Sequence, residues 1–304
     1  MSICMPATRF QLALVSLIAV LACARSSTLP SPQIPSPQSS SEEPTQPVPQ
    51  EESSSKSWQF SPTPELQHYN TLITTNIQQS TGQVVTTDSI ITRVQYSLSL
   101  VRSIASISLT GSIETFSVQA GNRIGKDTII PSFPVSFAGQ IQNHEFQLNL
   151  ASTNHSPMAS SLPCETPARS ALTTIQRNLF ITPLQIHAGM TWRDSLSSTF
   201  CSGELLLNLT ILRTYKVIGE SVVNGIFVVA VDLTEKTLSA GEGSQNQHRI
   251  IIHSNGLKSG HVYLDATTGL LLSFSSETRT TLQIQSSGKL QQFLQNSKEI
   301  TTLM

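Results

Sequence analysis

The feature that most constrains the fold of this chain is the alternation of apolar and polar residues after Trp58. In the longest example the apolar residues Leu205, Leu207, Leu209 and Ile211, and then Tyr215 and Val217, lie on one face of a long strand. A period of two residues is the period of a β-strand, because successive side chains point to opposite faces. Shorter runs with this period, such as Phe133–Phe137 and Phe146–Leu150, precede it. The chain is therefore expected to form a mainly β domain over residues 58–304.

Turn sequences separate these alternating runs. Asn224-Gly225 stands between two apolar runs, and both residues tolerate the positive φ that a two-residue hairpin turn requires. Asn255-Gly256 is interpreted as a second hairpin turn, and Asp265–Gly269 as a third turn in which the aspartate caps its own backbone. These turns predict a large antiparallel sheet or half-barrel of about 9–12 strands. The tail, Lys289–Leu303, fits either a short helix or a final strand.

One segment follows the helical period instead. Between residues 170 and 179 the apolar residues recur at helical spacing: Ala171, Leu172, Ile175 and Leu179. Pro167 suits the entry of a helix and Pro183 prevents its continuation, so we predict one short helix near 170–179. It divides the domain into segments 58–150 and 180–304, whose similar layout suggests two related halves. The sequence leaves open whether they form one sheet or two.

The first 22 residues have the features of a secretory signal peptide. Arg9 precedes the apolar, uncharged run Leu12–Ala22, and these eleven residues are too few for a bilayer span, which needs about 20. Cys23 follows in the tetrapeptide Val20–Cys23. Two alternatives stay open: Ala22 and Ala24 also satisfy the rule for ordinary secretory cleavage before Arg25, and the apolar run could be retained as a signal anchor.

The tetrapeptide Val20–Cys23 resembles the lipobox of bacterial lipoproteins. That resemblance implies that the chain is cut before Cys23, that the cysteine is acylated, and that the protein is held in the cell envelope by its lipid. By analogy with the sorting rule of enteric bacteria, Ala24 after the cysteine implies the outer membrane. Residues 23–57 are dominated by Pro, Ser, Gln and Glu, which cannot offset chain entropy by burial, so a disordered tether is expected.

Two further cysteines remain in the expected mature domain. Cys164 and Cys201 would lie in an oxidising compartment, so we predict that they form a disulfide. Closing a loop of this length stabilises a fold by roughly 3–4 kcal/mol in the chain-entropy model. Two free buried thiols are the alternative. A metal site is not expected, because no Cys-x-x-Cys pair or nearby histidine pair accompanies them.

The sequence offers little support for catalysis or nucleic-acid binding. Charged residues make up 12% of the chain, the net charge is −1, and no basic run is present, so no nucleic-acid partner is expected. No nucleophile elbow or phosphate-binding loop occurs, so we expect no enzyme, no catalytic residues and no cofactor. His253 and His261 are placed on neighbouring strands of one hairpin, where solvated histidines are a better interpretation than metal ligands. Seven carboxylates, including Asp194 and Glu235, are scattered, and their spacing predicts no pair.

The domain as a whole is similar to LolA-type lipid carriers and to other envelope lipoproteins. The similarity rests on its strand texture, on Gly189–Asp194 and on the turn Asp265–Gly269. It implies a half-barrel that binds a lipid or another apolar envelope ligand, through residues that the sequence does not identify. Within the first motif, Trp192 is interpreted as a packing residue. The alternative is a structural or assembly module that docks on another envelope component without a small-molecule ligand.

Overall fold

The computed structural model describes most of the predicted β domain. The described residues are 56–61, 64–81, 84–103, 106–121, 133–142, 145–151, 166–202, 205–245 and 248–304. The predicted signal peptide, Cys23 and nearly all of the predicted tether lie outside them. Cys164 and the side chain of Cys201 do so as well, so the disulfide stays a prediction.

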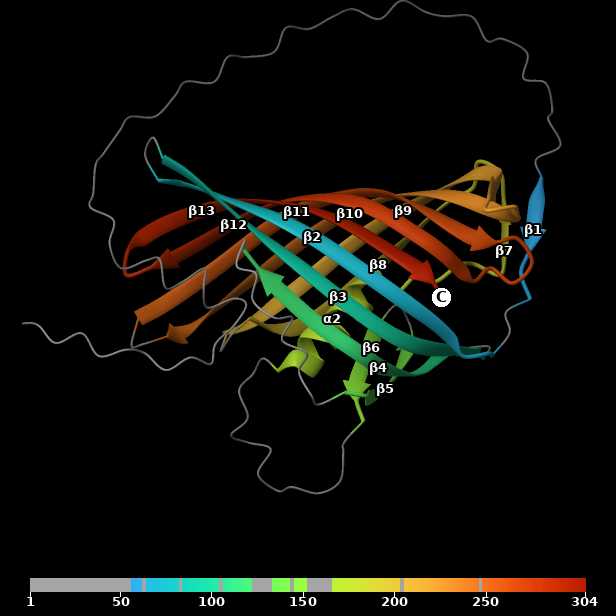
Figure 1. The fold of residues 1–304 in the computed structure, drawn as a ribbon, viewed down its shortest axis with the longest axis horizontal. Coiled ribbons are helices and arrows are strands. Elements are labelled where there is room, and N and C mark those ends of the chain that lie inside the picture. Colours follow the sequence, from blue (N-terminus) through green and yellow to red (C-terminus); the bar gives the residue numbers. More distant parts are fainter. Residues whose placement is uncertain are drawn as a thin grey trace, which may run out of the picture.

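The described residues form thirteen strands and one helix (Figure 1). In chain order these elements are β1 (Ser57–Gln59), β2 (Gln67–Thr81), β3 (Val84–Arg102), β4 (Ile107–Ala120), β5 (Val135–Gln142), β6 (Glu145–Leu150), α2 (Pro167–Asn178), β7 (Gln185–His187), β8 (Thr191–Ser202), β9 (Leu205–Val223), β10 (Ile226–Gln245), β11 (His248–Asp265), β12 (Leu271–Ser286) and β13 (Lys289–Leu303). Eleven strands make one sheet in the order β6-β5-β4-β3-β2-β13-β12-β11-β10-β9-β8, and β1 pairs separately with β7. The predicted large antiparallel half-barrel with one short helix is confirmed.

Both segments of the domain contribute to this single sheet. The tail forms β13, which pairs with β12 on one side and with β2 on the other, and so joins the two ends of the domain. Long strands twist, and eleven twisted neighbours curl the sheet. Figure 1 shows the result: β2–β4 cross over β8–β11, and α2 lies inside the curve of the sheet. Every neighbouring pair of strands in the sheet is antiparallel.

Two of the predicted turns are confirmed. Asn224 and Gly225 connect β9 to β10 with φ angles of 52° and 80°, the left-handed conformation that a tight hairpin turn requires. In the turn after β11, one carboxylate oxygen of Asp265 accepts hydrogen bonds from the backbone N–H groups of Thr267 and Thr268, at 2.9 and 2.7 Å. Gly269 closes this turn with a φ of 71°.

The predicted turn at Asn255-Gly256 is wrong. Both residues lie in the middle of β11, where Gly256 pairs with Thr237 of β10 and Thr280 of β12. The alternation of buried and exposed residues along β11 continues through Asn255 and Gly256. Pairing with β10 on one side and β12 on the other outweighs the local preference for a turn. A Cβ at Gly256 would stand 2.8 Å from the hydroxyl oxygen of Thr280, so the glycine permits a close approach between strands.

Helix α2 covers the opening between the two edges of the sheet. It begins after Thr166, whose hydroxyl accepts a hydrogen bond from the backbone N–H of Arg169. Its buried residues are Ala171, Leu172 and Ile175, three of the four predicted from the helical spacing, and the fourth, Leu179, is the residue that caps the end of the helix. They pack in one apolar cluster with residues of the edge strands, Leu148 from β6 and Leu196 from β8. These two edges approach each other but do not pair within the described part of the chain.

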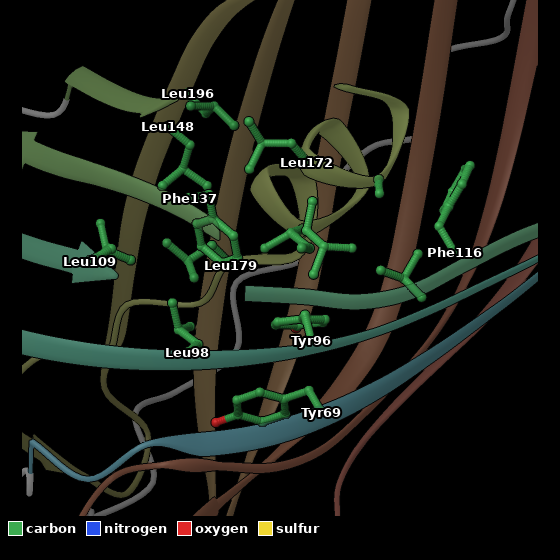
Figure 2. Packing of buried hydrophobic residues seen from close by; sticks show 14 of the residues in the cluster. Tyr69, Tyr96, Leu98, Leu109, Phe116, Phe137, Leu148, Leu172, Leu179 and Leu196 are labelled. Carbon is green, nitrogen blue, oxygen red and sulfur yellow. The ribbon is translucent and has the colours of Figure 1, made fainter. Parts of the chain in front are cut away.

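The apolar core fills the space between α2 and the inner face of the sheet. Figure 2 shows its side chains converging from the helix and from the inner faces of the strands. The labelled members are Tyr69, Tyr96, Leu98, Leu109, Phe116, Phe137, Leu148, Leu172, Leu179 and Leu196. Burial of such side chains contributes about 1.5–3 kcal/mol each, so this cluster is a principal source of stability. Among the described residues, no helix has both the length and the apolar character of a membrane span.

Candidate functional site

A row of charged side chains crosses the inner face of the sheet beside this apolar core. Asp194 of β8 stands directly opposite Arg213 of β9, which stands opposite Glu235 of β10, which stands opposite Lys258 of β11. Charges of alternating sign therefore occupy four consecutive strands at one level. Glu299 of β13 joins the end of this line through Lys258. We call these five residues the charged row.

Arg213 is the centre of the charged row. Its Nε donates to Glu235 at 3.2 Å, and its two terminal nitrogens donate to the backbone carbonyls of Leu179 and Arg177, both at 2.9 Å. The side chain is only 6% exposed. Burial opposes its charge, but Tyr215, Asp194 and Glu235 together raise the pKa of Arg213 above its ordinary value. The guanidinium therefore stays charged and fastens the end of α2 to the sheet.

The second half of the row repeats this arrangement with a lysine. The ammonium of Lys258 lies 3.1 Å from a carboxylate oxygen of Glu299 and 3.8 Å from one of Glu235. The side-chain amide of Asn178, at the end of α2, donates to the other oxygen of Glu299. Buried charges cost free energy unless they are paired and hydrogen-bonded, and here each one is. The row thus holds the end of α2 at two points.

The fold should lose stability in acid through Glu235. Burial tends to raise its pKa, but Lys258, Arg213, Arg177 and the hydroxyl of Thr237 lower it below the ordinary value. A carboxyl whose folded-state pKa is depressed stabilises the fold above its unfolded-state pKa of about 4.3. That contribution disappears as the pH falls through the folded-state value.

We therefore expect Glu235→Gln to lower the free energy of unfolding at pH 7 and to flatten its pH dependence below about pH 5. Urea unfolding of both proteins at a series of pH values measures this. Glu277→Gln is the matched control, because Glu277 pairs with Lys298 at 2.9 Å on the exposed surface, where solvent and salt screen the pair. Equal pH profiles for the wild type and Glu235→Gln would contradict the assignment.

An apolar hollow lies on the other side of the segment that follows α2. Its floor is the stacked pair Tyr69 and Tyr96, whose ring centroids are 5.4 Å apart, and Leu98 and Leu100 extend it along β3. Burial raises the pKa of Tyr69 to about 12, so its hydroxyl is neutral. The cleft measures about 620 Å³ out to open solvent, but the cavity itself is about 40 Å³. That is room for a few water molecules, whereas small-molecule sites measure roughly 300–1,000 Å³.

Residues 178–182, which we call the cover segment, separate this hollow from the charged row. Asn178, Leu179 and Phe180 line the hollow on one side and a second, smaller cavity beside Arg213 on the other. Polar contacts hold the segment at both ends. Arg213 binds the Leu179 carbonyl, and Arg102 donates to the Thr182 carbonyl at 2.5 Å. Displacing the cover segment would join the two cavities into one larger hollow.

The structure places several residues that the sequence singled out. Trp192 is a packing residue, as predicted: its ring stacks on Tyr215, with centroids 4.9 Å apart. His253 and His261 lie on the same strand, β11, so their placement on neighbouring strands is wrong. His261 instead faces Asp232 at 2.8 Å on the exposed side of the sheet. Among the described residues, no group of three or more His, Cys, Asp or Glu side chains could hold a metal ion.

The sequence alone does not predict the charged row, although it carries a signal for it. The spacing of Asp194 and Glu235 predicts no pair, but strand pairing brings both carboxylates to one guanidinium. Arg213 stands in phase with Ile211 and Tyr215, so the alternation already places a charge on the buried face of β9. Once the order and register of the strands are known, a charged residue on the buried face of each of three neighbouring strands indicates a buried ion-pair network.

Comparison with known proteins adds little. No family model matches the sequence, and no curated protein matches it. Among solved structures, the chain is similar to OccK2 (OpdF) of Pseudomonas aeruginosa, with 5% identity and a TM-score of 0.24 over 82% of this chain and 99% of that chain. It is also similar to a loop L8 deletion mutant of OmpT, an outer membrane protein of Vibrio cholerae, with 7% identity and a TM-score of 0.19 over 79% and 99%. Similarities this weak indicate nothing about the function of this chain.

Proposed function

We propose that this chain is a cell-envelope lipoprotein, acylated at Cys23 and held at the outer membrane, whose β domain binds a lipid or another apolar ligand without catalysing a reaction. The observation that carries the proposal is the cover segment. It lies between two small cavities, the apolar hollow and the cavity beside Arg213, and two of its backbone carbonyls accept hydrogen bonds from arginine side chains. The wall behind it is aromatic and aliphatic, the lining that apolar ligands prefer.

Ligand binding then requires displacement of the cover segment. As it stands, the cavity is too small for an acyl chain. The contacts at the two ends are hydrogen bonds, each contributing about 0.5–1.5 kcal/mol, or up to about 3 where a charged group takes part. Leu179 and Phe180 would leave apolar surroundings, and an apolar ligand in the same hollow would restore that burial. The sheet beneath, paired strand to strand, would keep its arrangement.

The test is the intact mass of the protein extracted from membranes, under native and denaturing conditions. We expect a chain that begins at Cys23 and carries acyl mass, and a Cys23→Ser variant that lacks that mass. We also expect a lipid that accompanies the native protein and is released on denaturation. An unmodified chain that begins at Arg25 would refute the lipoprotein assignment.

A pocket-filling variant tests the ligand separately from the anchor. Leu100→Trp in the Cys23→Ser background places a larger side chain in the hollow and should lower the amount of bound lipid. Leu257→Trp is the matched control, because Leu257 is 64% exposed on the outer face of the sheet. If neither the wild type nor the control retains any lipid, the ligand proposal is wrong.

The alternative, an interaction module, has its best support at the turn between β9 and β10. Val222, Ile226 and Phe227 are all more than half exposed there, and apolar side chains gathered at an exposed tip are typical of contact surfaces. The extraction experiment distinguishes the two functions. A native mass with a bound envelope protein and no lipid would favour the interaction module.

A further inference from the structure

Arg102 stands at the edge of the apolar hollow with few partners. It is the last residue of β3, lines the hollow together with Leu98 and Leu100, and donates one hydrogen bond, to the Thr182 carbonyl. In the described part of the chain no carboxylate forms an ion pair with it. A guanidinium has five N–H donors, so most of its binding capacity remains.

The surroundings of Arg102 disfavour its charge. Partial burial lowers the pKa of Arg102 below its ordinary value, which reflects lost hydration without a compensating anion. An arginine stays protonated even so, and a half-buried cation gains free energy when an anion reaches it. Arg213 differs in this respect, because carboxylates and carbonyls already surround it.

We propose that the ligand is an amphiphile with an anionic head group, a carboxylate or a phosphate, which Arg102 binds while the apolar chain lies along Tyr69, Tyr96 and Leu98. This inference rests on the proposed function and names its class of ligand. Both head groups accept two parallel hydrogen bonds from a guanidinium, which orients them as well as binding them. Apolar side chains line the hollow from Arg102 into the protein, so the apolar chain of an amphiphile would contact them while its head group binds Arg102.

The charged row is the less suitable place for the head group. Its two cations face three carboxylates, and Glu235 and Glu299 lie beside Lys258. An incoming anion would meet these carboxylates and would have to displace them. At Arg102 the head group replaces only a carbonyl of the cover segment, so binding there and displacement of the segment are the same event.

The experiment measures the affinity of the full chain, as the Cys23→Ser variant, for three probes with equal chains: dodecanoate, dodecyl phosphate and dodecanol, at pH 8. We expect dodecanoate or dodecyl phosphate to bind roughly tenfold to a hundredfold more tightly than dodecanol, as charge-assisted hydrogen bonds would give. Arg102→Gln should remove this preference, so that the three probes bind with similar affinity, and Arg102→Lys should restore part of it. Arg279→Gln, at an exposed arginine of β12, is the control and should behave like the wild type.

The outcomes separate the inference from the proposed function. If dodecanol binds as tightly as the anionic probes and Arg102→Gln changes nothing, the head-group assignment fails while the apolar site stands. Inorganic phosphate that displaces dodecyl phosphate at equal concentration would also overturn it, because the site would then recognise a free anion. If no probe binds, both the inference and the proposed function fail. Urea unfolding of Arg102→Gln checks that the fold is retained.

Discussion

Arg213→Met is expected to lower the free energy of unfolding by about 3–5 kcal/mol. The guanidinium binds Glu235 and the carbonyls of Leu179 and Arg177, and the site is buried. Methionine fills a similar volume but donates no hydrogen bond. Glu235 then loses one of its two cations, and two carbonyls at the end of α2 lose their donors. Urea unfolding at pH 7 measures the loss.

A double variant shows whether the loss of stability comes from the Glu235 carboxylate that Arg213→Met leaves without its arginine. In Arg213→Met with Glu235→Leu, Lys258 keeps Glu299 at 3.1 Å, and the carboxylate that is buried against Arg213 is gone. Asp194 also loses Arg213, but its side chain is 26% exposed and stays partly solvated. Replacement of a buried ion pair by apolar residues of similar volume is often nearly neutral. We expect the double variant to be more stable than Arg213→Met alone. A loss below about 1 kcal/mol in the single variant would show that the row does not hold α2.

Gly111→Ala is expected to lower the free energy of unfolding by about 3 kcal/mol, the upper range for overpacking a core. Gly111 of β4 pairs with Leu98 of β3 and Phe137 of β5, in the middle of three strands. A Cβ there would stand 2.1 Å from the backbone carbonyl oxygen of Ser97 and 2.5 Å from the ring of Phe137. The carbonyl belongs to the ladder and the ring is 1% exposed, so neither can move away freely.

Gly243→Ala is the matched control for this substitution. Gly243 also lies in a long strand, but the atom that its Cβ would meet is a terminal methyl of Leu205, at 2.3 Å. A methyl group at the end of a flexible side chain can rotate away, so we expect a change of less than about 1 kcal/mol. Thermal unfolding of both variants gives the comparison. A loss for Gly111→Ala as small as that for Gly243→Ala would mean that the backbone of the sheet adjusts at Gly111.

The chain's local patterns determined the kind of structure that forms. Alternation of period two predicted the strands, the spacing of Leu172 and Ile175 predicted the helix, and Asn224-Gly225 predicted a hairpin turn. Each of these signals depends on residues that are neighbours in the chain. The predicted turn at Asn255-Gly256 is wrong because residues distant in the chain, on β10 and β12, decide the conformation there.

Only the tertiary structure decided what meets across the sheet. The tail pairs with β2, the first strand of the large sheet, and that contact unites the two segments in one sheet. Strand order and register align Asp194, Arg213, Glu235 and Lys258 in one row, although about 20 residues separate each from the next. The sequence places each of these charges on a strand, but a shift of register by one residue would turn every one of them to the opposite face. The cover segment and the hollow likewise exist only where the curled sheet and the end of α2 meet, because packing between distant segments creates them.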